Sequence, residues 1–194
     1  MIFSTESLLG QCKLKSGDVK LLKGQTSINL QYDYSSMAVG KFKTEDDYLK
    51  DKVADMNKKK AGSGDEWETK WKGDRESRFQ PMFVKNLNDE LKKYQVTCAE
   101  KAADAKYTLI VHTTFTEPGF NAVVGGIRKN ANVTLMVDLV ETANPSAVIA
   151  NIELKNVQSA NMMGYDYDTG GRIQSCYDRA GGELGKFLAK NAFK

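Results

Sequence analysis

The residues best suited to chemistry lie in the segment 164–172, which reads Gly-Tyr-Asp-Tyr-Asp-Thr-Gly-Gly-Arg. Tyr165, Asp166, Asp168 and Arg172 bring phenolic, acidic and guanidinium groups together just before a predicted helix. Free N–H groups at the start of a helix attract anions. The segment therefore predicts a small-ligand or hydrolytic site at a helix amino terminus, with these four residues as its members.

The Asp-x-Asp pair in this segment is similar to two known motifs but completes neither. In a calcium loop the glycine follows at a different step, and a glutamate closes the loop where this chain has Tyr177. In an Asp-x-Asp phosphotransfer element, Thr or Val belongs where Gly170 stands. We therefore favour a capped loop with Asp168 or Thr169 as the N-cap, and keep the ligand site as its alternative.

Other candidates for chemistry are few. His112 is the only histidine, and no serine or cysteine partner can be assigned to it, so a structural role is favoured over a general base. A structural zinc site needs four Cys or His ligands, and the widely spaced Cys12, Cys98 and Cys176 with one histidine predict none. One disulfide with a free thiol and three reduced thiols both remain open for these cysteines.

Composition excludes several classes of function. The chain has 41% apolar and 27% charged residues, which is typical of a globular protein. A net charge of +3 from 28 basic and 25 acidic residues gives no basis for predicting a nucleic-acid partner. The sequence contains neither a phosphate loop nor a dinucleotide fingerprint, so no cofactor is predicted. It also lacks the run of ~20 apolar residues of a transmembrane segment, and its first residues do not form a signal peptide.

Period-two alternation of apolar and polar residues marks the strands that would position these groups. Strands are predicted at 27–32, 107–115, 131–140 and 148–157, and short connections make the last three antiparallel neighbours. On the strand 107–115, odd-numbered side chains share one face, and His112 lies on the other. The glycine-containing stretch 120–129 is a candidate edge strand.

Helical spacing of apolar residues occupies much of the rest. Thr44 followed by three acidic residues predicts a helix that ends near Lys60. The aromatic residues Trp67, Trp71 and Phe79 recur at helical spacing, and a core role is favoured over a ligand-stacking surface. Pro81 predicts a kink or a new helix in this segment. A terminal helix is expected at 168–192, where closely packed glycines should lie against the sheet.

These elements predict an α+β fold, also describable as an α/β sandwich. We expect one mixed, mostly antiparallel sheet of four or five strands with helices packed largely on one face. The whole chain, 1–194, is expected to form a single α/β domain. In it, the helical segment 44–94 is inserted between the first strand and the strands of 107–157.

Several segments resemble uncharacterised exported proteins of the Bacteroidetes type. They are YTLIVHTTFTEPGF at 107–120, GYD at 164–166, RI at 172–173, KSGD at 15–18 and FQPMF at 79–83. The order strand, helices, three strands, helix is also similar to the α/β module of the TolB amino-terminal domain and of curli-secretion lipoproteins. In those families the module serves envelope assembly and protein contacts. The resemblance implies no catalytic or binding residue.

The sequence therefore favours a non-enzymatic, envelope-associated binding or assembly module of unknown specificity. Its partner would be an envelope protein or a second copy of the chain, for which the strand at 120–129 is one candidate surface. The alternative is a small-ligand-binding or hydrolytic protein with its site at 164–172. The resemblance implies a periplasmic or outer-membrane-associated location, and without it the expected location is cytoplasmic.

Overall fold

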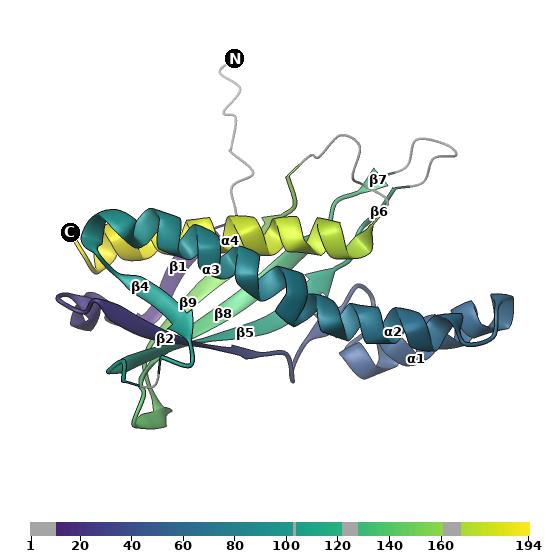
Figure 1. Ribbon diagram of the computed structural model, residues 1–194, viewed down its shortest axis with the longest axis horizontal. Helices are drawn as coiled ribbons and strands as arrows, with labels where there is room; N and C mark the ends of the chain where they lie inside the picture. The colour runs from purple at the N-terminus through teal and green to yellow at the C-terminus, as the bar shows by residue number, and fades with distance from the viewer. Residues whose placement is uncertain (1–10, 103, 122–127, 161–167) are drawn as a thin grey trace, which may run out of the picture.

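The computed structural model describes residues 11–102, 104–121, 128–160 and 168–194. Its centre is a mixed, twisted sheet of seven strands in the order β1-β9-β8-β5-β2-β4, with β3 paired to the end of β5. Two long helices, α3 and α4, run side by side across one face of this sheet (Figure 1). The result is a two-layer α/β arrangement.

Antiparallel pairing joins the strands on one side of the sheet. β5 (Tyr107–Glu117), β8 (Asn132–Glu141) and β9 (Asn144–Gln158) follow one another as antiparallel neighbours. β1 (Gln11–Gly17) adds to the outside of β9, also antiparallel. The predicted strands of 107–157 are confirmed, because short connections favour antiparallel neighbours.

Parallel pairing joins the other side. β2 (Ser27–Asp33) runs parallel to both β5 and β4 (Thr97–Glu100), and β3 (Ala38–Val39) runs parallel to β5. The predicted number of four or five strands is therefore too low, since β1, β3 and β4 were not predicted. They are short or irregular and carry no clear period-two pattern. The pairing is antiparallel among β1, β9, β8 and β5. On the other side of the sheet, the helical segment after β3 forms a crossover connection, so β4 can run parallel to β2.

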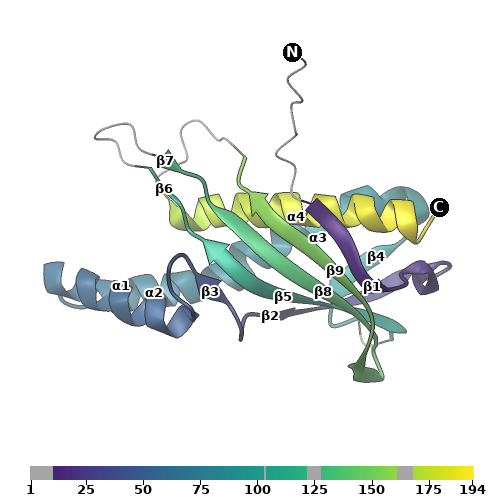
Figure 2. The same cartoon turned by 180° about the vertical axis from the view of Figure 1, so that it is seen from behind.

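The helices divide into two groups. α1 (Glu45–Lys59) and α2 (Ser63–Asp74) form a hairpin, here called the arm, that extends beyond the sheet (Figures 1 and 2). A π-helical turn, η2 (Arg75–Phe79), joins α2 to α3 (Gln80–Leu91), and α4 (Thr169–Asn191) follows the last strand. The prediction that the helices of 44–94 cover the sheet holds for α3 and not for the arm.

Local sequence explains where these helices begin and bend. Thr44 caps α1, and its hydroxyl accepts a hydrogen bond from the backbone N–H of Asp47 at 3.2 Å. Pro81 lies in the first turn of α3, where its missing N–H costs no helical hydrogen bond, so the predicted second helix is confirmed. Two short 3₁₀ turns, Lys20–Leu22 and Lys92–Tyr94, and a small hairpin of β6 (Phe120–Asn121) with β7 (Arg128–Lys129) complete the described elements.

The core lies between the sheet and the α3–α4 layer. Its largest fully buried side chains include Phe83 and Leu87 of α3 and Tyr177 of α4. Gly181 of α4 lies against the backbone of Phe83, and Gly185 lies against Leu87 and Glu90. The glycines of this helix therefore allow close approach of α3, and the expectation that they pack against the sheet is wrong.

Candidate functional site

The sheet face turned away from α3 and α4, here called the open face, carries an ordered group of polar side chains. No described helix covers this face (Figure 2). On it, Asp33 of β2, His112 of β5, Asp138 of β8 and Asn151 of β9 lie side by side across four strands. We call these four residues the His112 cluster.

Hydrogen bonds connect the His112 cluster. Nδ1 of His112 lies 2.8 Å from Oδ2 of Asp33, and Nε2 lies 3.3 Å from Oδ2 of Asp138. The amide of Asn151 donates a hydrogen bond to the other oxygen of Asp138. The strand register places these residues, because Asp33 is opposite His112 and Asp138 is opposite Asn151. Both ring nitrogens of the histidine are thus held by carboxylates.

Asp33 is also fixed by the turn that follows β2. The backbone N–H and the hydroxyl of Ser35 both donate to its carboxylate, at 3.0 and 3.1 Å. These backbone and side-chain hydrogen bonds, with that of His112, hold the pKa of Asp33 below its usual value. The carboxylate therefore stays charged on the open face at neutral pH.

The side chains of the His112 cluster are partly exposed to solvent. The side chains of Asp33, His112 and Asp138 are 34%, 27% and 20% exposed. Three clefts among the described residues lie at the start of α4, along α1, and beside the β8–β9 turn. None of them includes a member of the cluster. Such a surface can contact a partner, but it does not exclude water from a bound substrate as enzyme sites do.

The cleft at the start of α4 is the place where the predicted ligand site falls. Its volume is about 540 Å³, and Asp168 and Arg172 both line it. Tyr165 and Asp166, the other two predicted members, lie outside the described residues. His112 does not join this group, since it lies on the open face of the sheet and α4 packs on the opposite face.

The two predicted site residues that line this cleft, Asp168 and Arg172, already have partners within the fold. Asp168 caps α4 by accepting from the N–H of Gly170 at 3.1 Å, and it forms an ion pair with Arg78. The ion pair with Arg78, among other contributions, lowers the pKa of Asp168 below its usual value despite partial burial. Arg172 donates to the carbonyl oxygens of Pro118 and Gly119 at 3.1 and 3.2 Å, which ties α4 to the end of β5.

The predicted aromatic cluster lies where the arm joins the body. Trp71 and Phe79 are buried, and Trp67 packs against Trp71 with ring centroids 5.5 Å apart. These positions agree with the favoured core role. Phe79 stacks on Tyr177 at 5.1 Å, which connects the π-helical turn η2 to α4.

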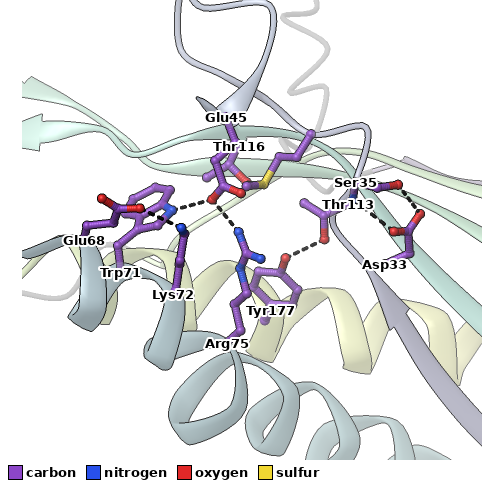
Figure 3. Close-up of polar contacts among 11 residues, drawn as sticks. Asp33, Ser35, Glu45, Glu68, Trp71, Lys72, Arg75, Thr113, Thr116 and Tyr177 are labelled. Atoms are coloured by element: carbon purple, nitrogen blue, oxygen red, sulfur yellow. Dashed lines mark hydrogen bonds and ion pairs between the residues drawn. The ribbon is translucent and has the colours of Figure 1, made fainter. Parts of the chain in front are cut away.

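A single carboxylate secures this junction. Glu45 at the start of α1 accepts hydrogen bonds from the indole of Trp71 and the guanidinium of Arg75 (Figure 3). Beside it, the hydroxyl of Tyr177 lies 2.6 Å from that of Thr113 on the helix-facing side of β5. Glu45 therefore ties α1 to α2 and to the π-helical turn η2, and the Tyr177–Thr113 contact ties α4 to β5.

Three further observations concern the cysteines, possible metal ligands and the character of the described helices. Cys12, Cys98 and Cys176 are all free thiols. Among the described residues there is no group of three acidic, histidine or cysteine side chains that could hold a metal ion. No helix in the described ranges has both the length and the apolar character needed to cross a membrane.

Sequence reasoning identified His112 but missed its neighbours. Asp33 ends a predicted strand, and Asp138 and Asn151 occupy outward positions of two others. Their polar character at outward positions was visible in the sequence. Their proximity was not, because it depends on the register between strands that are far apart in the chain.

Comparison with known proteins gives structural neighbours only. No protein-family model matches the chain, and no curated protein matches it significantly. A PelC dodecamer from Paraburkholderia phytofirmans matches with 12% identity and a TM-score of 0.40, over 88% of this chain and 98% of that chain. Protein XCC0632 of Xanthomonas campestris, assigned to the family DUF330, matches with 10% identity and a TM-score of 0.37, over 92% and 93%.

A third neighbour is described as a homologue of a neuraminyllactose-binding hemagglutinin from Helicobacter pylori. It has 10% identity and a TM-score of 0.36, over 91% of this chain and 87% of that chain. At these values the three neighbours carry no functional assignment to this chain. The Bacteroidetes-type origin and the likeness to the TolB and curli modules stay predictions.

Proposed function

We propose that this protein is a non-enzymatic, envelope-associated binding or assembly module whose working surface is the open face of its sheet. The observation that carries the proposal is the His112 cluster, an ordered polar group on a broad surface that no described helix covers. Polar groups held in fixed positions on an open surface can be matched by a partner's polar groups, which confers specificity on a protein contact.

The surroundings of the cluster favour binding over catalysis. A catalytic histidine needs a nucleophile or a substrate proton within reach, in a site that excludes water. Here both nitrogens of His112 are engaged by carboxylates, and its side chain faces solvent in part. Ser35 donates its hydroxyl to Asp33 and not to the histidine. The arrangement thus holds the ring in place and leaves it no activated nucleophile.

The envelope location rests on the sequence resemblance. Fractionation of the native cells, with sequencing of the mature amino terminus, tests it directly. Recovery from the periplasm or outer membrane supports the proposal, and recovery as a cytosolic protein without any bound partner contradicts it.

The working surface is tested by photo-cross-linking in cells. A benzophenone amino acid at Met136, in the centre of the open face, should form a cross-linked product with another protein chain. The same group at Lys186, which lies exposed on the helical side of the molecule, is the matched control and should form none. Cross-linking from Lys186 and not from Met136 would refute the open face as the working surface.

A second candidate function is small-ligand binding in the cleft at the start of α4. The cleft volume, within the range of about 300–1,000 Å³ that holds small ligands, favours this alternative. Because two arginines line the cleft, inorganic phosphate is a suitable first probe. Binding should shift the backbone amide signals of Gly171 and Gln174 in a titration followed by NMR. Unchanged signals at saturating phosphate would count against an anion site.

A further inference from the structure

We infer that the open face binds a second copy of this chain, with a two-fold axis that runs along β8 near Met136. This inference rests on the proposed function and names the partner for it. The observation behind it is a single row of side chains that crosses five strands of the open face. We call it the cross-strand row, and from β1 to β2 it reads Lys13, Glu153, Met136, His112, Asp33.

The strand register defines this row. Lys13 of β1 is opposite Glu153 of β9, which is opposite Met136 of β8. Met136 is opposite His112 of β5, which is opposite Asp33 of β2. The neighbours of Glu153, Met136 and His112 along their strands, such as Ile152, Leu135 and Val111, are fully buried beneath the helices, so these three side chains lie on the open face. Lys13 and Asp33 share that face because the strand register places them opposite Glu153 and His112.

The row is complementary to itself under a two-fold rotation. Suppose that two copies pack with their open faces together, related by a two-fold axis that runs along β8. The rotation then exchanges the strands on the two sides of β8 and keeps each residue's position along the strand direction. Lys13 of one copy then lies over Asp33 of the second copy, and Glu153 lies over His112. Met136 meets its own counterpart on the axis. The Lys13–Asp33 contact joins opposite charges and occurs twice, as an isologous interface requires.

The geometry of stacked sheets tolerates this arrangement. Packed sheets lie ~10 Å apart, and their strands cross at about 30°. Neighbouring strands are ~4.8 Å apart, so the crossing angle displaces a residue two strands from the axis by about 5 Å. A lysine side chain is long and flexible enough to span such a displacement. The exposed Lys13 can therefore reach Asp33 of the second copy.

The available area fits a dimer of moderate affinity. β5, β8 and β9 have 11, 10 and 15 residues. Five strands at the usual spacing, each contributing roughly nine residues, give a face of about 24 Å by 30 Å, or roughly 700 Å² for each copy. Specific interfaces bury about 800 Å² per partner. Ile110 and Met136, both partly buried, supply apolar contacts within this face.

One residue opposes the arrangement and so provides a distinctive test. Asp138 lies on β8, two residues from Met136, and would meet Asp138 of the second copy near the axis. Like charges at close range weaken association. Asp138→Asn should therefore strengthen the dimer severalfold, since an amide can still hydrogen-bond to Asn151. A substitution that merely damaged a monomeric surface would not have this effect.

Sedimentation velocity over a range of protein concentrations tests the inference. The unmodified chain should dimerise reversibly. Lys13→Glu and Asp33→Lys should each weaken the dimer by about tenfold or more, because each replaces two opposite-charge contacts with repulsion. An equimolar mixture of the two variants should recover dimers, since both contacts then join opposite charges. Lys186→Glu on the helical side is the matched control and should leave association unchanged, and thermal denaturation checks that every variant is folded.

Cross-linking gives an independent measure of the axis. Met136→Cys in a Cys12→Ser background should be joined to itself by a short bismaleimide, whereas Lys186→Cys should not. A monomer at every concentration, or a dimer insensitive to all these substitutions, overturns the inference. If Met136 then cross-links in cells to a different protein, the proposed function survives without self-association. If it cross-links to nothing, both fail.

Discussion

Replacing Gly181 by alanine should separate α3 from α4 and destabilise the fold. A Cβ atom at this position would lie 2.2 Å from the carbonyl oxygen of Phe83 and 2.9 Å from its carbonyl carbon. Ordinary contact begins at 3.4 Å, so the two helices must move apart by about 1 Å. The obstacle is backbone, which cannot rotate away as the end of a side chain can.

The magnitude follows from two opposing effects. Alanine in a helix interior is favoured over glycine by about 1 kcal/mol. Overpacking of a well-packed core costs about 1–3 kcal/mol, and here it affects fully buried neighbours such as Phe83 and Tyr177. The net change in the free energy of unfolding should therefore be a loss of up to about 2 kcal/mol.

Gly182→Ala is the matched control. It lies one residue further along the same helix, and a Cβ atom there would meet nothing within 4 Å. This substitution should raise the free energy of unfolding by about 0.5–1 kcal/mol through helix propensity alone. For a chain of this length, the two variants should differ in melting temperature by about 1–12 °C.

Urea denaturation followed by circular dichroism measures both effects. The reasoning is refuted if Gly181→Ala is as stable as Gly182→Ala, because the close approach of the helices would then impose no cost. An unchanged dependence of unfolding on urea concentration would show that the variants alter stability and not the extent of unfolding.

Three further predictions follow from local contacts. Burial raises the pKa of the Cys98 and Cys176 thiols to about 12, so neither should react with a thiol reagent until urea unfolds the chain. Asn88→Ala should lower the free energy of unfolding by about 1–2 kcal/mol, because its side chain donates to the carbonyl of Cys98 and accepts from its N–H, and thus satisfies the outer edge of β4. The pKa of Asp33 in the folded chain is lowered chiefly by the hydrogen bond from the N–H of Ser35. The charged Asp33 carboxylate therefore stabilises the fold above the unfolded pKa of ~3.9, and this stabilisation is lost as the pH falls through the folded pKa. Asp33→Asn should therefore reduce the loss of stability in acid, as measured by urea denaturation at a series of pH values.

The long elements of the fold were predictable because each has a local signal. The alternation of apolar and polar residues along β5 and β8, and the apolar stripe of α4, indicate which side chains are buried. Thr44 and Pro81 mark helix starts, because Thr is a favoured N-cap residue and Pro is favoured in the first turn. β1 was missed because Lys13 and Lys15 give its exposed edge a polar character, and its bulge interrupts the alternation. The parallel position of β2 between β5 and β4 depends on contacts between distant segments, which no local pattern encodes.

The proximity of the candidate site residues was even less predictable from the sequence. An acid at the end of a strand, such as Asp33, is ordinarily a turn residue, and Asp138 is an ordinary outward residue of an antiparallel strand. Only the register brings both to His112, and a shift of one residue would turn each side chain to the other face. The segment 164–172 attracted attention instead because its polar residues are adjacent in sequence. There, Asp168 proves to cap α4 and to pair with Arg78.

The glycines of α4 and the polar open face both relate to the two-layer arrangement of the molecule. Gly181 and Gly185 draw α3 and α4 close together, so the pair forms one narrow layer on one side of a seven-stranded sheet. A third layer on the other side would require an apolar face, whereas this chain places Asp33, His112 and Asp138 there. These groups are hydrogen-bonded to one another, so the face is stable in water yet can be covered by a surface of complementary charge. A sheet face built in this way is better suited to reversible contact with another protein than to permanent burial within its own chain.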